Sequence, residues 1–376
     1  MADSLLRTFL RRLTGGSLQH KRNAGAALEE GKRLSLAGDH PQAALAFERV
    51  LALEPDNAEA HFRLGLAARD QQQLERAAAA YRRAIELRPA YIEAHNNLGS
   101  VLQMLGRNEE ALEAYRRAVA LAPDFAQPYL NLGRLCAAGG DRDNAAATFQ
   151  QAIARGIDVE IFKHLLSALR GETTAQAPDG YTRSLFDNFA GDFDRRLVQE
   201  LGYRIPETLA ARIKALEPRR DLRVLDLGCG TGLCGVQLAG CFTQMTGVDL
   251  SAAMLEKARA RNIYTELADA SIGEWLEKAA PNEYDLVLAA DVLVYFGDLA
   301  SLFAQIARVL DAGGLYAFSI ESGTSHDFVL QPSGRYAHAA DYVRRVCNQL
   351  GFEEIEAFAH HIRGDVNGFV FIVRKS

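Results

Sequence analysis

The stretch Val224-Leu225-Asp226-Leu227-Gly228-Cys229-Gly230-Thr231-Gly232 decides the fold of the C-terminal half of this 376-residue chain. An apolar run containing one acid breaks into three glycines at alternate positions, and Leu233 and Val236 then begin a helical pattern. This order predicts a buried strand, a sharp turn and a helix N-terminus. Because glycine has no Cβ, a ligand can approach such a turn closely. We therefore expect a nucleoside-type cofactor at the carboxyl end of this first strand.

The spacing of the glycines separates two kinds of cofactor. The dinucleotide fingerprint G-x-G-x-x-G places a diphosphate at a helix N-terminus, whereas this loop has Leu233 at the third glycine position. Asp226, two residues before the first glycine, disfavours a diphosphate but can hold a cationic ammonium group, directly or through water. A plain NAD-binding domain stays open as the main rival interpretation.

The segment Asp226-Leu227-Gly228-Cys229-Gly230-Thr231-Gly232 resembles the first motif of class I S-adenosylmethionine-dependent methyltransferases. The resemblance covers roughly residues 181–376. It implies a Rossmann-like sheet of seven strands, the last one antiparallel. It also implies S-adenosyl-L-methionine as cofactor, with S-adenosyl-L-homocysteine as product.

Further predicted strands end in residues to which the resemblance gives a role. A strand at 244–250 contains Asp249, which can accept both ribose hydroxyls, and Ser251 can cap the next helix. Strands at 265–268 and 284–290 precede Asp269, implied to meet the adenine amine, and Asp291, at the reaction mouth. The implied cofactor contacts at these strand ends are Asp226, Gly228, Cys229, Gly230, Thr231, Gly232, Asp249, Leu250, Met254, Asp269, Ala270, Asp291 and Val292. Three segments complete the predicted sheet: 313–319 as the fifth strand, and 353–359 and 368–373 as a closing hairpin around 363–367.

An aromatic pair precedes the glycine turn. Phe186 and Phe193 are seven residues apart and therefore share one helical face. In many small-molecule methyltransferases an aromatic-Asp pair at the spacing found in residues 186–194 forms a helix over the cofactor, and Arg204 can then meet the methionine carboxylate. The alternative is that both phenylalanines are core residues.

Four residues are candidates for catalysis on the acceptor side: Asp291, Tyr295, Tyr336 and His338. A Tyr-x-His cluster can orient or deprotonate an acceptor, because histidine titrates near neutral pH. The alternative is that Tyr336 and His338 fix a loop onto the sheet. The sequence around them, Gly334-Arg335-Tyr336-Ala337-His338, resembles segments of bacterial methyltransferases that carry tetratricopeptide repeats.

The N-terminal half repeats with a period of 34 residues, which is the period of tetratricopeptide repeats. Small residues let paired helices approach, an aromatic fills the gap between them, and proline ends the second helix. We expect four repeats over 24–157 and a capping helix, so that the array spans 24–170, followed by a linker at 171–180 and the methyltransferase domain at 181–376. The repeating positions are Gly31, Gly65, Gly99 and Gly133; Ala43, Ala77, Ala111 and Ala145; Phe47, Tyr81, Tyr115 and Phe149; and Pro55, Pro89 and Pro123.

A repeat array presents a curved surface that can hold a partner. Asn97 and Asn131 occupy equivalent positions, and in related arrays an asparagine there faces the groove and bonds a peptide backbone. The alternative is that both are merely solvated. Residues 1–23 are basic and apolar in turn, which fits an amphipathic helix on a membrane or partner, or an N-terminal cap or frayed tail.

Composition limits the partners and the compartment. A net charge of −6 and 48% hydrophobic residues are typical of soluble globular proteins and give no support to a nucleic-acid partner. No apolar run reaches the length of a membrane helix. The five cysteines have no metal-site spacing, so we expect no metal, and their odd number fits a reducing compartment, so we expect a cytoplasmic protein. The cysteines are Cys136, Cys229, Cys234, Cys241 and Cys347.

Three functions remain open from the sequence. The first is methyl transfer to a small-molecule acceptor. The second is methyl transfer to a peptide or protein that the repeat groove recruits. The third is a non-enzymatic interaction scaffold with a vestigial cofactor site. The intact glycines and aspartates weigh against the third, and the aromatic residues around the expected pocket favour the first.

Overall fold

The computed structural model describes residues 20–189, 193–323 and 326–376. The chain folds into two compact units, Met1–Asp158 and Val159–Ser376. Most of the predicted amphipathic segment lies outside the described residues. Within the described part of the chain, no helix combines the length and apolar character needed to span a bilayer.

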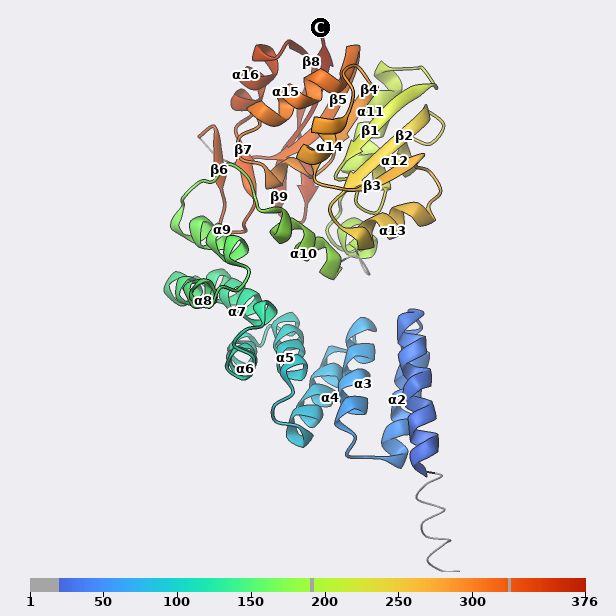
Figure 1. The fold of residues 1–376 in the computed structure, drawn as a ribbon, viewed down its shortest axis with the longest axis vertical. Coiled ribbons are helices and arrows are strands. Elements are labelled where there is room, and N and C mark those ends of the chain that lie inside the picture. The colour runs from blue at the N-terminus through green and yellow to red at the C-terminus, as the bar shows by residue number, and fades with distance from the viewer. Residues whose placement is uncertain (1–19, 190–192, 324–325) are drawn as a thin grey trace, which may run out of the picture. The chain divides into compact units, whose positions relative to one another are not determined.

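The first unit consists of helices that pack in consecutive pairs (Figure 1). A helix over residues 20–36 pairs with α2, and three further pairs follow in chain order. This arrangement confirms the predicted all-α tetratricopeptide array. The helices are α2 (His40–Leu53), α3 (Ala58–Asp70), α4 (Leu74–Leu87), α5 (Ile92–Met104), α6 (Asn108–Leu121), α7 (Ala126–Ala138) and α8 (Arg142–Ala154).

The repeated glycines explain how closely the paired helices approach. A Cβ at Gly99 would lie 2.7 Å from the ring of Tyr115, and one at Gly133 would lie 2.2 Å from the ring of Phe149. The same clash recurs at Gly31 and Gly65 against the aromatic residue of their own repeat. Because these rings are buried, a side chain at the glycine position would force the two helices apart. The glycine and the aromatic residue thus form one packing unit per repeat.

The second unit contains a seven-stranded sheet in the order β3-β2-β1-β4-β5-β9-β8. The first five strands in the chain are parallel, and β9 is antiparallel to both of its neighbours. This confirms the predicted Rossmann-like sheet, including its closing hairpin. The strands are β1 (Leu222–Leu227), β2 (Phe242–Asp249), β3 (Glu266–Asp269), β4 (Tyr284–Ala289), β5 (Leu310–Glu321), β8 (Phe352–Arg363) and β9 (Val366–Lys375).

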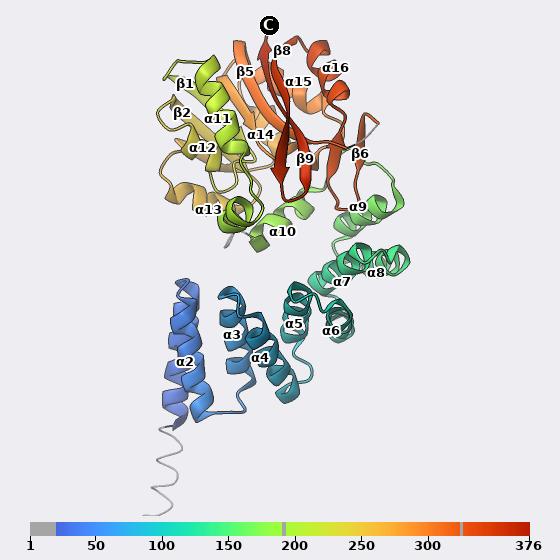
Figure 2. The same cartoon turned by 180° about the vertical axis from the view of Figure 1, so that it is seen from behind.

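Helices cover both faces of this sheet (Figures 1 and 2). On one face, apolar side chains of α11 (Ile205–Leu216) and α12 (Leu233–Gln237) share a buried cluster with β1, β2 and β4. On the other face, α14 (Ile272–Lys278), α15 (Ala300–Val309) and α16 (Ala340–Gln349) form a second cluster with the sheet. Strands buried on both faces read as continuous apolar runs, which is why β1 and β4 are recognisable in the sequence.

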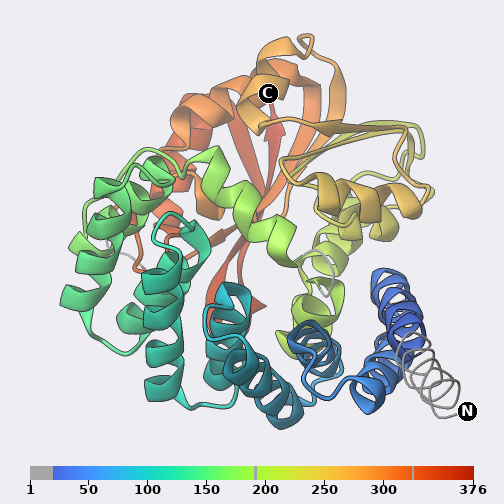
Figure 3. The same cartoon turned by 60° about the horizontal axis from the view of Figure 1, so that its bottom comes forward.

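Two parts of the second unit differ from the sequence-based expectation. Helix α9 (Val159–Arg170), which we predicted as the cap of the repeats, groups with the second unit. The ring of its His164 lies 3.0 Å from the carbonyl oxygen of Gly334 and packs against Tyr181, with ring centroids 5.1 Å apart. Helix α10 (Asp179–Phe189) begins inside the predicted linker, and Figure 3 shows it crossing in front of the strands.

A small hairpin was not anticipated. Strands β6 (Phe328–Leu330) and β7 (Tyr336–His338) form a separate two-stranded sheet. Such three-residue strands carry too few residues to show a period of two in the sequence.

Candidate functional site

The glycine turn has the backbone geometry that its sequence predicted. Gly228, Gly230 and Gly232 all have positive φ angles, of +65°, +54° and +88°. The N–H groups of Gly228 and Cys229 donate to the carbonyl oxygen of Val248 at 2.8 and 3.1 Å, which ties the turn to β2. Residues with a Cβ rarely adopt this conformation, so the turn requires glycine for its shape as well as for ligand access.

Asp249, the last residue of β2, holds the same turn. Its Oδ2 accepts the backbone N–H of Gly230 at 2.8 Å, and its Oδ1 accepts that of Ser251 at 2.9 Å. Ser251 in turn caps α13 (Ala252–Ala260) by accepting the N–H of Met254 at 3.2 Å, as its position predicted. Burial raises the pKa of Asp249, and the two N–H donors oppose that effect. Both carboxylate oxygens therefore position the loop, and their remaining lone pairs are what a ligand can use.

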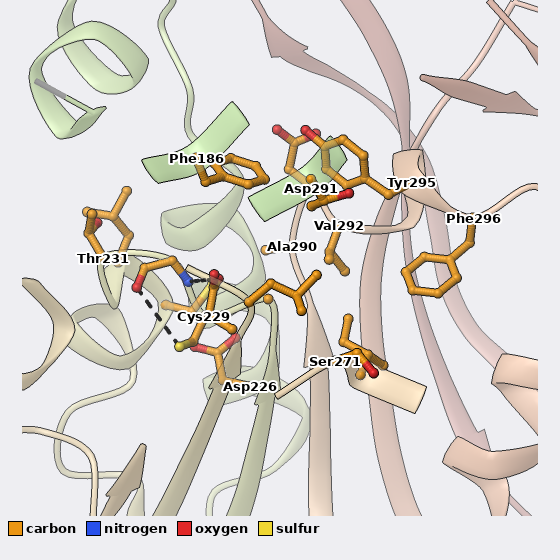
Figure 4. A pocket seen from close by; sticks show the side chains of 18 of the residues that line it. Phe186, Asp226, Cys229, Thr231, Ser271, Ala290, Asp291, Val292, Tyr295 and Phe296 are labelled. Atoms are coloured by element: carbon orange, nitrogen blue, oxygen red, sulfur yellow. Dashed lines mark hydrogen bonds between the residues drawn. The ribbon is translucent and has the colours of Figure 1, made fainter. Parts of the chain in front are cut away.

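One pocket gathers most of the predicted cofactor residues at the carboxyl edge of the sheet (Figure 4). Figure 4 shows Asp226 and Cys229 on one side and Phe186, Asp291 and Tyr295 on the other. The predicted site residues that line this pocket are Phe186, Phe193, Asp226, Gly228, Cys229, Gly230, Thr231, Asp249, Leu250, Ala270, Asp291, Val292 and Tyr295.

Four predicted cofactor residues do not line the pocket. Met254 is fully buried in α13, and Gly232 packs against Tyr264, whose ring would lie 2.9 Å from a Cβ there. Asp269 ends β3 with a half-exposed side chain, 3.9 Å from the guanidinium of Arg183. Arg204 forms an exposed ion pair with Glu207 at 3.2 Å. Its neighbours Tyr203 and Pro206 line the pocket, so the methionine-carboxylate role of Arg204 stays a prediction.

Phe186 and Phe193 both line the pocket, but Phe186 lies in α10 and Phe193 follows residues outside the described part of the chain, so a helix over the cofactor stays a prediction. Phe186 of α10 makes edge contacts with Phe193 and Tyr295, with ring centroids 5.9 and 5.7 Å apart. Asp187 accepts a hydrogen bond from the hydroxyl of Ser251, which attaches α10 to the helix after Asp249. These rings form an apolar wall of the pocket, so they can exclude water from a bound ligand.

A second attachment joins Asp194 and Arg261 to the glycine turn at Thr231. Asp194 accepts hydrogen bonds from the hydroxyl of Thr231 and from the guanidinium of Arg261. Arg261 also donates to the carbonyl oxygen of Thr231 at 2.5 Å. The segment before the π-helix η1 (Arg195–Glu200) is thus bound to the glycine turn itself.

Asp291 belongs to a partly buried chain of charged side chains. It has a φ of +58°, and its N–H donates to the hydroxyl of Ser319 at 2.9 Å. Its carboxylate accepts a hydrogen bond from Arg363, which also donates to Glu321. Arg335 lies 3.6 Å from Glu321 at the far end of this chain. Arg363 is only 5% exposed, so it compensates two acids where water cannot.

Tyr336 and His338 correct the prediction of a catalytic Tyr-x-His cluster. Both side chains are fully buried and neither lines the pocket. Tyr336 shares a short hydrogen bond with the hydroxyl of Thr174, and the His338 ring lies 3.0 Å from the carbonyl oxygen of Gly297. Tyr336 and His338 are two residues apart in β7, so they share one face of the strand, and both are buried there. Their contacts match the alternative interpretation, in which they fix a loop.

The buried histidine makes stability depend on pH. Burial lowers the pKa of His338 from 6.5 to about 4. As the pH falls below 6.5 the unfolded chain takes up this proton first, so the free energy of unfolding decreases until the pH reaches the folded-state value. We expect His338 to contribute a loss of about 3 kcal/mol between neutral pH and pH 4.

Urea unfolding at a series of pH values measures this effect. The variant His338→Gln should lose stability less steeply than the parent chain between pH 6.5 and pH 4. The exposed histidine at position 20 gives the control variant, His20→Gln. Parallel profiles for the parent and His338→Gln would count against this assignment.

Asp226 has a partner that the sequence analysis missed. It is 1% exposed, and its Oδ2 accepts a hydrogen bond from the hydroxyl of Tyr264 at 2.7 Å. Burial raises the pKa of Asp226 to about 7, and the Tyr264 hydrogen bond opposes this rise. Tyr264 lies between α13 and β3, 38 residues away in the chain, so no local pattern links the two.

In the repeat array, Asn131 is bonded within the protein. Its Nδ2 donates to Asn96 at 2.9 Å, and its Oδ1 accepts from Gln127 at 3.0 Å. Asn97, its counterpart in the preceding repeat, is partly buried. An amide oxygen and an amide nitrogen can each make a further hydrogen bond, so partner binding at these asparagines stays a prediction.

Comparisons with known proteins agree with this geometry. Residues 224–314 match a family described as a methyltransferase domain, and 65–106 and 91–156 match families described as a TPR repeat and a tetratricopeptide repeat. The malonyl-[acyl-carrier protein] O-methyltransferase of Legionella pneumophila is 30% identical over 168 residues, which cover 42% of this chain and 57% of the relative. The trans-aconitate 2-methyltransferase of an Acidovorax strain is 31% identical over 169 residues, covering 42% and 60%.

A solved structure gives a similar match. The magnesium protoporphyrin IX methyltransferase of Synechocystis PCC 6803, with bound SAM, aligns with a TM-score of 0.44 and 18% identity, covering 54% of this chain and 100% of that one. The chain spans less than two thirds of the length of either curated relative. From the matched families and the seven-stranded sheet, the chain contains a methyltransferase domain, joined to tetratricopeptide repeats.

Proposed function

We propose that this protein transfers a methyl group from S-adenosyl-L-methionine to a small-molecule acceptor. The observation that carries the proposal is the pocket at the glycine turn, which joins Asp226 and Asp249 to a wall formed by Phe186, Phe193 and Tyr295. The first two residues suit a nucleoside with an ammonium group, and the aromatic wall suits a compact organic acceptor.

The residues present fit this cofactor. A Cβ at Gly230 would meet no atom within 4 Å, so the turn leaves room for a ligand directly above its backbone. Asp249 lies beside it with lone pairs for two ribose hydroxyls. The Asp226 carboxylate offers a partner for the ammonium group. Ala270 and Ile272 line the part of the pocket after β3, where an apolar adenine face can lie.

When bound, S-adenosyl-L-methionine supplies a methyl group on a positively charged sulfur, which is a strong electrophile. The remaining task of the chain is to align the acceptor with that methyl group and to keep water out. Phe186, Phe193 and Tyr295 exclude water from the pocket. Asp291, held by Arg363, can accept a hydrogen bond from an acceptor hydroxyl or amine and so direct its lone pair.

The relatives support a small acceptor. Their names assign methyl transfer to trans-aconitate, a small carboxylic acid, and to malonyl-[acyl-carrier protein], a small acyl group carried by a protein. An acceptor carried by a protein, as in the second relative, is compatible with repeats that bind a carrier or another protein partner. We therefore assign the repeats an interaction role and the pocket the acceptor itself.

Radiolabelled S-adenosyl-L-methionine tests this proposal on the full chain. After incubation with a cell extract, label should accumulate in small molecules other than S-adenosyl-L-methionine itself. Excess S-adenosyl-L-homocysteine should suppress this transfer. Enzyme-dependent label in the protein fraction alone would contradict a small acceptor and favour a peptide or protein substrate. No transfer to either fraction, although the cofactor binds, would favour a non-enzymatic scaffold.

A further inference from the structure

Tyr264 is fixed beneath the glycine turn by close backbone contacts. A Cβ at Gly232 or at Gly247 would lie 2.9 Å from its ring, and one at Gly235 would lie 2.9 Å from its hydroxyl oxygen. These glycines belong to the turn, to β2 and to α12, so the phenol is held from three sides. Its hydroxyl donates to Asp226 Oδ2 at 2.7 Å, which fixes the carboxylate relative to the turn.

The second carboxylate oxygen of Asp226 is left for a ligand. No hydrogen bond within the described part of the chain engages Oδ1, and Asp226 lines the pocket. The other titratable groups around Asp226 are Tyr203, Cys229, Cys234 and Asp249, none of which carries a positive charge. Among residues 20–189, 193–323 and 326–376, no lysine, arginine or histidine lines this pocket. A buried acid without a cationic partner favours a ligand that brings one.

We infer that Tyr264 is a positioning residue that holds Asp226 in place to receive the α-ammonium group of the cofactor. The inference rests on the proposed function, because it takes S-adenosyl-L-methionine as the ligand of this pocket. It adds a residue outside the pocket lining that decides how strongly the charged end of the cofactor is bound.

Binding of the cofactor should be accompanied by release of a proton from Asp226. An ammonium group beside Asp226 favours its ionised form, so binding releases the proton that this carboxyl holds near neutral pH. Affinity should therefore rise with pH through the neutral range and level off once Asp226 is ionised in the free protein. Loss of the Tyr264 hydroxyl removes a donor that favours the ionised form. In Tyr264→Phe the rise should therefore occur at higher pH.

Two ligands that differ at the amino-acid end separate a change at the ammonium contact from a general disturbance of the binding site. S-adenosyl-L-homocysteine carries the ammonium group, whereas 5′-methylthioadenosine has the same adenosine and sulfur without it. Calorimetry on the full chain, from pH 6 to pH 9 and in buffers of different ionisation enthalpy, gives both the affinity and the protons released. Tyr316→Phe is the matched control, because its buried hydroxyl has no hydrogen-bond partner among the described residues.

For the parent chain, we expect affinity for S-adenosyl-L-homocysteine to rise about tenfold from pH 6 to pH 8, with proton release near pH 7. Affinity for 5′-methylthioadenosine should stay nearly constant. In Tyr264→Phe, affinity for the first ligand at pH 7 should fall several-fold, while that for the second should change less than about twofold, the spread expected of a substitution without a specific contact. Tyr316→Phe should resemble the parent.

The role of Tyr264 and the assignment of the cofactor can fail separately in these measurements. Equal affinity of Tyr264→Phe and the parent for S-adenosyl-L-homocysteine at all pH values, or equal losses for both ligands, would overturn the role of Tyr264 and leave the cofactor assignment intact. If the parent binds neither ligand, both fail. If Tyr264→Phe does not fold, Asp226→Asn replaces it: it should bind S-adenosyl-L-homocysteine more weakly and without pH dependence, and an unchanged pH profile would overturn the inference.

Discussion

Alanine at position 228 is expected to abolish cofactor binding and to destabilise the methyltransferase domain. Gly228 has a φ of +65°, and a Cβ there would lie 2.5 Å from Cγ2 and 3.0 Å from Cβ of Val292. The left-handed backbone costs a residue with a side chain roughly 1–2 kcal/mol, and overpacking adds about 1–3 kcal/mol. The sum corresponds to a fall in melting temperature of roughly 5–15 °C for a domain of this size. Since Gly228 and Val292 both line the pocket, any relief of the clash displaces the site itself.

Gly240 provides the matched control for this substitution. It has a similar φ, +79°, but a Cβ there would meet no atom within 4 Å, and it does not line the pocket. Gly240→Ala should therefore show the backbone cost alone and keep its affinity for S-adenosyl-L-homocysteine. Thermal unfolding with and without that ligand measures both quantities. If the ligand raised the melting temperature of Gly228→Ala as much as that of the parent chain, the account of the turn would be contradicted.

Replacement of Asp249 by alanine should have a comparably large effect, because this carboxylate has two functions. Its removal leaves the buried N–H of Ser251 and the partly buried N–H of Gly230 without acceptors, at about 1–3 kcal/mol each. Loss of the proposed ribose contact should weaken binding of S-adenosyl-L-homocysteine by a further ~1–3 kcal/mol, roughly 5- to 150-fold. Calorimetry and urea unfolding of the same preparation separate the two effects.

Asp285 tests whether the loss of affinity is specific. It is a nearly buried acid at the opposite end of the sheet, where it accepts the N–H and the guanidinium of Arg223 at 2.9 Å. Asp285→Ala should lower stability but leave ligand affinity unchanged. If Asp249→Ala binds S-adenosyl-L-homocysteine as tightly as Asp285→Ala does, the ribose role of Asp249 is wrong.

The fold could be predicted because its signals are local or periodic. Parallel strands buried on both faces appear as apolar runs, and their carboxyl ends meet at one edge, so Asp226, Asp249 and Asp291 were placed together from the sequence. The repeats were visible because glycine and its aromatic partner recur every 34 residues. Both features depend on contacts between residues at fixed spacing.

The remainder of the site depends on contacts between distant segments. Arg363 reaches Asp291 across 72 residues, and Tyr264 reaches Asp226 across 38, through pairings that only the assembled sheet creates. The burial of His338 was not predicted, because it lies in β7, a strand of three residues that is too short to show a pattern. The role of Arg204 stays a prediction, because the direction of a side chain at a helix N-terminus is set by its neighbours and not by its position in a motif.

A crystal structure of the full chain with S-adenosyl-L-homocysteine tests the central claim most directly. We predict the ribose hydroxyls within hydrogen-bond distance of Asp249, the ammonium group at Asp226, and the sulfur facing the wall of Phe186 and Tyr295. A nicotinamide dinucleotide bound in this pocket in preference, with its diphosphate against Gly228 and Gly230, would contradict the account.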